Sequence, residues 1–245
     1  MANHAPRILV GCPTHVLKTD SLDAYVKGIE GLTYPHYDVM IEDNSPTEEY
    51  AELIHQKFET WKKNNPEKKL IITHTENPPE HARERLVNGR NLIRDYFLKN
   101  EYTHFLSLEQ DIVPPRDVIE RLLAREKDIC SGVYLNQQTK EDGKHLVVMA
   151  GTDAANNANE DAVQSLGFMN LFPARIMEIA YCGVGCILIS KNALEKIKFR
   201  VDLEKRASDD IYFARDAKAS GFTLYLDTSM LCAHHFNDAF KKTKY

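Results

Sequence analysis

Short apolar runs alternate with longer amphipathic stretches through the first half of the chain. The runs predict β-strands, because a strand buried on both faces reads as a continuous apolar segment. They are Arg7–Gly11, Tyr37–Ile41, Lys69–Thr73, His104–Leu108 and Asp128–Tyr134. The stretches between them repeat apolar residues at helical spacing and predict helices over Leu22–Ile29, Thr47–Asn64, Glu80–Lys99 and Arg116–Arg125. Strands that alternate with helices in this way favour a mainly parallel sheet covered by helices on both faces.

The alternation breaks after the fifth predicted strand. The segment 136–170 is polar and has little periodicity, apart from a strand-like stretch at His145–Ala150, and Ala154–Asp161 is typical of a surface loop or lid. Regular elements return further on, with expected bounds Arg175–Ala180, Cys182–Ser190, Lys191–Ile197, Ser208–Ser220, Phe222–Leu226 and Met230–Ala233. No internal repeat and no clear linker interrupt the sequence, so we expect one domain over residues 1–245.

Two carboxylates stand directly after the fourth predicted strand. Glu109 and Asp111 follow His104–Leu108 and precede Pro114 and Pro115, where a strand must end because proline cannot donate to a sheet ladder. Ligands of open α/β sheets bind at the carboxyl ends of the strands. Mg²⁺ and Mn²⁺ prefer carboxylate ligands and complete their shell with phosphate oxygens. The pair therefore indicates a metal site, although a solvated strand end or a helix cap would use the same residues.

Other motifs and the composition narrow the function classes. Acidic clusters also occur at Glu42–Ser45 and at Asp209–Asp210, whereas the glycine patterns of dinucleotide-binding folds, P-loops and α/β-hydrolases are absent from the sequence. The net charge of −5, with mixed signs along the chain, gives no field that would attract nucleic acid. The five cysteines lie in mostly apolar segments and are expected to be buried free thiols rather than a zinc site.

The apolar segments are too short for a membrane span, and the N-terminal residues have no signal-peptide pattern. We therefore expect a cytoplasmic protein without a transmembrane segment.

These segments, taken in order over residues 7–235, resemble GT-A glycosyltransferases, close in pattern to the family-2 type. The resemblance is carried by I-L-V-G-C-P-T in the first strand, E-D-N-S after the second, Arg90–Asn91 before the acidic strand and F-L-S-L-E-Q-D in it. Later marks are G-V-G-C-I-L-I-S from Gly183, S-D-D-I-Y-F from Ser208, G-F-T-L-Y-L-D from Gly221 and the closing C-A-H-H. The resemblance implies a mainly parallel nucleotide-binding sheet flanked by helices, with a smaller mixed sheet on the acceptor side. Residues 1–135 would hold the donor, and residues 136–245 would hold the acceptor and the catalytic acids.

The resemblance also implies roles for particular residues. The segment Glu109–Gln110–Asp111 stands at the family's D-x-D position, with glutamate in place of the first aspartate, and Asp111 would bind Mn²⁺ or Mg²⁺ at the donor diphosphate. His234 would complete the metal shell, with His235 as the alternative. Asp209 or Asp210 would be the catalytic base, although both could instead serve only as helix N-terminal acids. The residues expected to bind the donor are Pro13, Thr14, Glu42, Asp43, Arg90, Glu109 and Gln110.

Several readings stay open from the sequence. Arg90 could approach the diphosphate or pair with an acid, and Gly183 and Gly185 could let the backbone approach a sugar or could form a bulge. The expected function is transfer of a sugar from a nucleotide-diphospho-sugar to a glycan, lipid-linked or protein acceptor, with inversion as the expectation. One alternative is a nucleotidyltransferase, although Gly11–His15 lacks the basic residue expected there. The other is a non-catalytic nucleotide-sugar or glycan binding module.

Overall fold

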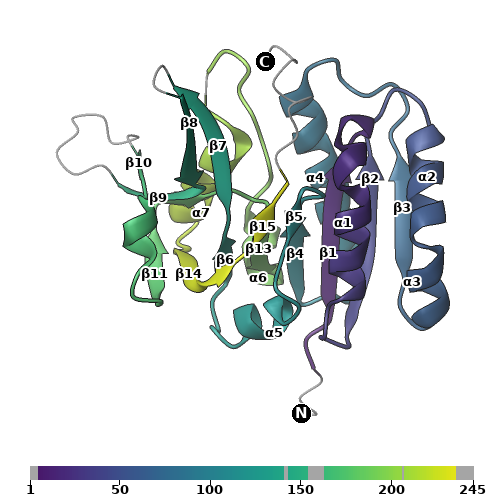
Figure 1. The fold of residues 1–245 in the computed structure, drawn as a ribbon, viewed down its shortest axis with the longest axis horizontal. Helices are drawn as coiled ribbons and strands as arrows, with labels where there is room; N and C mark the ends of the chain where they lie inside the picture. The colour runs from purple at the N-terminus through teal and green to yellow at the C-terminus, as the bar shows by residue number, and fades with distance from the viewer. Residues whose placement is uncertain (1–4, 141–142, 154–162, 206, 236–245) are drawn as a thin grey trace.

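A sheet of eight strands forms the centre of the computed structural model, which describes residues 5–140, 143–153, 163–205 and 207–235. The strand order is β11-β14-β6-β13-β4-β1-β2-β3 (Figure 1). These strands are β1 (Ile8–Thr14), β2 (Tyr37–Asp43), β3 (Leu70–His74), β4 (His104–Leu108), β6 (Ile129–Val133), β11 (Ile176–Ile179), β13 (Cys186–Ser190) and β14 (Leu224–Leu231). The first four run parallel, and β14 runs parallel to β6, whereas β13 is antiparallel to both β4 and β6 and β11 is antiparallel to β14. The predicted mainly parallel sheet is therefore confirmed.

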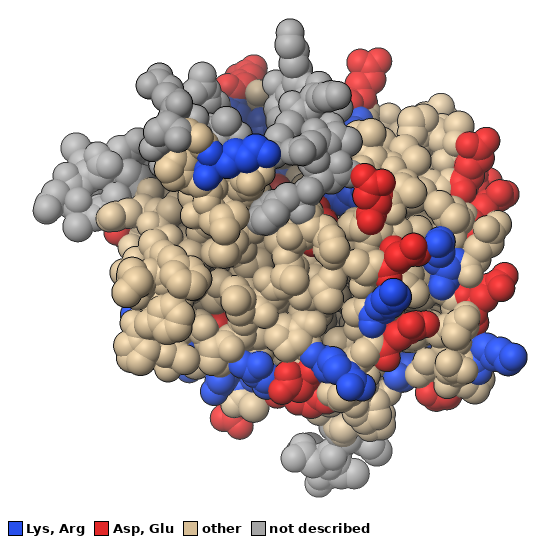
Figure 2. All heavy atoms as spheres, in the orientation of Figure 1, with Lys and Arg blue, Asp and Glu red and all other residues tan. Residues whose placement is uncertain are grey.

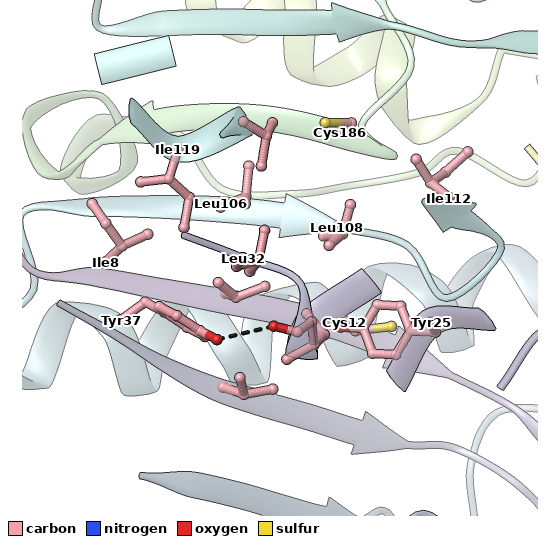
Figure 3. Packing of buried hydrophobic residues seen from close by; sticks show 14 of the residues in the cluster. Ile8, Cys12, Tyr25, Leu32, Tyr37, Leu106, Leu108, Ile112, Ile119 and Cys186 are labelled. Carbon is pink, nitrogen blue, oxygen red and sulfur yellow. Dashed lines mark hydrogen bonds between the residues drawn. The ribbon is translucent and has the colours of Figure 1, made fainter. Parts of the chain in front are cut away.

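Helices cover both faces of this sheet. They are α1 (Thr19–Glu30), α2 (Glu49–Lys57), α3 (Glu59–Asn64), α4 (Ala82–Lys99), α5 (Val118–Leu123), α6 (Lys191–Lys196) and α7 (Asp209–Ala219), with 3-10 turns η1 (Val16–Lys18) and η2 (Phe168–Leu171). Side chains alternate between the faces along β1, so Ile8 and Val10 pack in one core with α1 and α5, and Leu9 packs in the other with α4 and α6. Figure 3 shows the first core, where Tyr25 from α1 and Ile119 from α5 lie against the strands.

The predicted helix over Thr47–Asn64 is divided at Phe58 into α2 and α3. Phe58 is fully buried and packs edge-on against both Tyr25 and Trp61. The division lets the apolar side chains of two short helices face the same core. The five cysteines are buried and carry no disulfide, as expected.

The polar region after β6 is the largest departure from the expected elements. It contains the hairpin β7 (Leu135–Lys140) and β8 (Gly143–Val148), followed by β9 (Ala150–Asp153) and β10 (Val163–Ser165), and β9 also pairs with β12 (Tyr181–Cys182). The strand-like stretch at His145–Ala150 overlaps β8 and the start of β9, whereas β7 was not expected. The expected lid over Ala154–Asp161 lies outside the described residues.

A two-stranded ladder completes the architecture near the acidic segment. The strands β5 (Ile112–Val113) and β15 (Ala233–His234) pair antiparallel, with His234 opposite Ile112. This pairing places β15, the last described strand, beside the segment that follows β4. The two predicted strands Phe222–Leu226 and Met230–Ala233 are instead β14 followed by β15.

The exterior visible in Figure 2 has no continuous patch of one charge sign. Acidic and basic side chains are interspersed over the α1–α3 side and along the lower edge. Within the described ranges, none of the helices combines the length and the hydrophobicity that crossing a bilayer requires.

Two glycine-to-alanine substitutions are expected to change stability in opposite directions. A Cβ at Gly11 in β1 would lie 2.3 Å from Cε2 of Phe105 and 2.6 Å from Cγ2 of Ile93, both in buried side chains. Gly11→Ala should therefore destabilise the fold by about 1–3 kcal/mol. At Gly28 in α1 the nearest atom would be 3.5 Å away, so Gly28→Ala should gain roughly 0.5–1 kcal/mol from lower chain entropy. Urea unfolding measures both, and equal stabilities would contradict the close packing at β1.

Candidate functional site

A cavity of about 410 Å³ opens at the carboxyl ends of β1 and β4. Most of the residues predicted for the site line it: Pro13, Thr14, Arg90, Glu109, Asp111, Asp209, Asp210, His234 and the alternative His235. Further lining residues that the sequence analysis had not selected include Lys18, Asn44, Tyr134 and Gln137. The position agrees with the rule that α/β sheets bind ligands beyond the carboxyl ends of their strands.

The acidic turn, Glu109–Gln110–Asp111, begins where β4 ends. The amide of Glu109 donates to the carbonyl of Gly185 at 2.9 Å, and the amide of Ile112 returns to the carbonyl of Glu109 at 2.9 Å. The turn thus redirects the two carboxylates into the cavity. The amide of His235 donates to the carbonyl of Asp111 at 2.8 Å, which fixes the end of β15 beside the turn.

Asp111 lies between an ammonium and an imidazole. Its Oδ2 is 3.0 Å from Nζ of Lys18 and 3.8 Å from Nε2 of His234. Burial opposes the charged carboxylate, but Lys18 and His234 outweigh it and hold the pKa of Asp111 below its ordinary value. Burial likewise opposes the imidazolium of His234, but the hydrogen bond and charge of Asp111 raise the pKa of that imidazole.

The orientation of His234 is set by its second ring nitrogen. Nδ1 lies 2.6 Å from the carbonyl of Leu135, and because a carbonyl only accepts, Nδ1 must carry the hydrogen. In the neutral ring, Nε2 then carries the lone pair on the side of Asp111. A ring that donates from one nitrogen to a backbone carbonyl and keeps the other nitrogen for a ligand is common among metal-binding histidines. The ring of Tyr134 packs edge-on against the imidazole at 5.6 Å and holds it in place.

These residues fit a cation that a substrate helps to hold. No cluster of three or more His, Cys, Asp or Glu side chains able to bind a metal occurs in the described residues. Asp111 and His234 could supply two ligands. Among the residues that the structure describes, Oδ1 of Asp111 is buried without a hydrogen-bond partner. Mg²⁺ sites built from one or two carboxylates, phosphate oxygens and water have this character.

Arg90 connects the acidic turn to α7. It is 2% exposed, and its two terminal nitrogens donate to Oε1 of Glu109 and Oδ2 of Asp209. Burial disfavours the guanidinium, but Asp209 and Glu109 raise its pKa. The geometry therefore favours the acid-pairing reading of Arg90. The second carboxylate oxygen of Glu109 lies 3.7 Å from Nζ of Lys18, so this side chain contacts both Arg90 and Lys18.

The acid pair at the start of α7 has two different environments. Asp209 is bound by Arg90, whereas Oδ1 of Asp210 accepts the hydroxyl of Ser208 and the amide of Ile211, the latter at 2.8 Å. Burial is the main reason that the pKa of Asp210 is raised above its ordinary value. The two carboxylates therefore have different hydrogen-bond partners although they are adjacent in sequence.

Three of the predicted donor-binding residues are not among those that line the cavity. Asp43 accepts from the amide of Ser45 at 3.0 Å and contacts Nδ1 of His74 at 3.0 Å, and Glu42 accepts from Thr75 and Asn44. Burial raises the pKa of Glu42. These two acids shape the loop that presents Asn44 to the cavity, and the amide of Asn44 donates to the carbonyl of Thr14 at 3.0 Å.

Gln110, the third of these residues, points away from its acidic neighbours. Its Oε1 accepts from Thr14 and, at 2.9 Å, from Tyr50, while its Nε2 donates to the carbonyl of Lys18 at 2.6 Å. Gln110 therefore ties the acidic turn to the loop after β1.

Gly183 and Gly185 are explained by Tyr134. A Cβ at Gly183 would lie 1.9 Å from the phenol oxygen of Tyr134, and one at Gly185 would lie 2.9 Å from it. The amide of Gly185 also donates to this oxygen at 3.1 Å. The glycines thus make room for a buried tyrosine of the same protein, a pairing that neither of the sequence readings included.

Comparison with known proteins establishes the fold. No protein-family model and no curated protein matches the chain. The chain is similar to the crystal structure of GalNAc-T7 with UDP, GalNAc and Mn²⁺, with a TM-score of 0.66 and 13% identity over 96% of this chain and 45% of that one. It is also similar to S. aureus TarS 1–349 in complex with UDP-GlcNAc, with a TM-score of 0.58 and 12% identity over 98% of this chain and 62% of that one. The fold is therefore that of GT-A-like glycosyltransferase structures, and the chain spans less than two thirds of the length of these two neighbours.

Proposed function

We propose that this chain is a metal-dependent glycosyltransferase that moves a sugar from a nucleoside-diphospho-sugar donor to an acceptor hydroxyl, with inversion at the anomeric carbon. The proposal is supported above all by one juxtaposition: Asp111 and His234 face the same cavity as Asp209 and Asp210. Donor complexes of the two structural neighbours contain UDP with GalNAc and Mn²⁺ in one case and UDP-GlcNAc in the other.

In this proposal, residues 1–135 hold the donor. Pro13, Thr14 and Asn44 line the part of the cavity next to β1 and would contact the nucleoside. Glu42, Asp43 and Gln110 support these loops through their hydrogen bonds. Asp111 and His234 would hold Mn²⁺ or Mg²⁺, which when bound supplies positive charge at the departing diphosphate.

Residues 136–245 supply the acceptor side and the base. The acceptor hydroxyl attacks the anomeric carbon, the bond from that carbon to the diphosphate oxygen breaks, and a carboxylate takes the hydroxyl proton. Asp210 is the better candidate for this base, because burial raises its pKa and Arg90 is bound to Asp209 instead. Arg90 would then position Asp209 and Glu109 rather than contact the donor.

A thermal-shift screen of UDP-, GDP- and other nucleotide-sugars with Mn²⁺ tests this function. A ligand that binds only the folded state adds about 2.7 kcal/mol at 100 times its Kd, which is roughly 5–10 °C for a chain of this size. We expect one nucleotide class to raise the Tm in this way, and chelation of the metal to reduce the shift. Donor hydrolysis with and without Mn²⁺ follows for that class. The proposal is contradicted when no nucleotide-sugar shifts the Tm of folded protein.

One observation bears on the nucleotidyltransferase alternative. Such an enzyme needs a basic residue after the first strand, and Lys18 reaches the cavity from this loop, three residues beyond His15. The two functions differ in their products. Incubation with nucleoside triphosphates and sugar 1-phosphates should release no pyrophosphate, whereas release of pyrophosphate would favour the alternative.

A further inference from the structure

Lys18 is buried where a loop lysine would ordinarily extend into water. Its side chain is 12% exposed at the end of η1, and it lines the cavity. Lysine is almost never buried without a partner, because removing its charge from water is costly. The partners of Lys18 therefore explain its position.

All three residues of the acidic turn contact Lys18. Asp111 and Glu109 place carboxylate oxygens 3.0 Å and 3.7 Å from its Nζ. Gln110 donates to its carbonyl at 2.6 Å, and the hydroxyl of Ser21 donates to the same carbonyl at 2.8 Å. The backbone of Lys18 is thus fixed on both sides, so its ammonium can move only through rotation of the side chain.

The ammonium of Lys18 lies beside the oxygen of Asp111 to which a metal would bind. Lys18 and His234 both approach the same oxygen of Asp111, at 3.0 Å and 3.8 Å. A divalent cation bound to Asp111 and His234 would lie close to Nζ, and like charges at that separation repel strongly in a partly buried site. Arg90 cannot be the cation that pairs with Asp111, because its terminal nitrogens are bound to Glu109 and Asp209.

We propose that Lys18 is the resident cation of the acidic turn, that it competes with a divalent metal for Asp111, and that the diphosphate of the donor is the anion that draws it away. The inference rests on the proposed function. It makes Lys18 a donor-binding residue and makes metal and nucleotide bind cooperatively, because each removes the obstacle to the other.

Lys18→Met separates this role from a structural one. Methionine keeps the length of the side chain and removes its charge, so Mn²⁺ should bind the variant at least about tenfold more tightly than wild type, as measured from the electron paramagnetic resonance signal of free Mn²⁺ without nucleotide. UDP binding without metal, measured by calorimetry, should be at least about tenfold weaker. A merely structural lysine would change both affinities in the same direction.

Matched variants complete the experiment. Lys27→Met changes an exposed lysine on α1 and should behave as wild type, and Lys18→Gln retains a hydrogen-bond donor for Asp111 in case methionine prevents folding. If Mn²⁺ binding is lost in Asp111→Asn but is not tightened in the Lys18 variants, the competition is refuted while the proposed function stands. If neither Mn²⁺ nor any nucleotide binds the folded protein, the proposed function itself fails.

Discussion

Replacing Asp111 with asparagine is expected to lower kcat for sugar transfer by about 10²–10³-fold, the range seen when one group that stabilises developing charge is removed from an active site. Asparagine has nearly the same shape but lacks the negative charge that would hold the metal and that faces Lys18 and His234 at 3.0 Å and 3.8 Å. The reason for the loss is therefore electrostatic. The measurement is kcat over a Mn²⁺ titration, and added metal should restore little of the activity.

The control for this variant is Asp117→Asn. Asp117 is an exposed acid directly before α5 that pairs with Arg121 at 3.7 Å. It lies outside the residues that line the cavity, and a surface pair of this kind contributes little. Its activity and melting temperature should equal those of wild type. Asp111→Asn should also remain folded, because Glu109 lies 3.7 Å from Lys18 and can continue to pair with it. Full activity of Asp111→Asn in the presence of a chelator would refute the metal-binding role.

The parallel half of the fold was predictable from local sequence. The predicted strand His104–Leu108 has the same bounds as β4, because its mostly apolar residues are buried in the sheet. The antiparallel insertion of β13 between β4 and β6 had no local signal, because an apolar run reads the same in either direction. Of the hairpin β7–β8, only part of β8 was predicted, at His145–Ala150, and β7 was missed because backbone pairing with β8 rather than an apolar sequence pattern defines it.

Site residues that directly follow a predicted strand could be predicted from the sequence. Residues whose role depends on partners distant in the sequence could not. Asp111 was selected because it follows an apolar run and precedes two prolines. The partners of Arg90 were not, since Glu109 and Asp209 lie 19 and 119 residues further along the chain and only the fold brings them together. Lys18 was missed because a lysine in a loop is ordinarily solvated, and only the turn around Gln110 buries it. The one available signal was that Lys18 is the first lysine or arginine after the first predicted strand.

The second large effect on activity is expected from a substitution in the pair of aspartates at the start of α7. Asp210→Asn is expected to lower kcat by about 10²–10⁴-fold, the usual contribution of a general base, with little change in donor KM. A base acts only when ionised, so wild-type kcat should fall as the pH is lowered through the pKa of Asp210. Because burial raises that pKa, the fall should begin at a higher pH than for an ordinary aspartate, whose value is 3.8. The pH profile of kcat measures this directly, and the acidic limb should be absent in Asp210→Asn.

Asp209→Asn is the matched control because it neutralises the adjacent acid in the same helical turn. Its main effect should be on stability, since the buried guanidinium of Arg90 would lose one of its two carboxylate partners, and breaking a buried pair costs about 3–5 kcal/mol. The acidic limb of the pH profile should persist in this variant. If the limb instead disappears in Asp209→Asn and remains in Asp210→Asn, the base is Asp209. If both variants bind nucleotide-sugar as wild type does and no folded form turns over, the chain is a binding module, because the two acids are then dispensable while the site around Asp111 still recognises the donor.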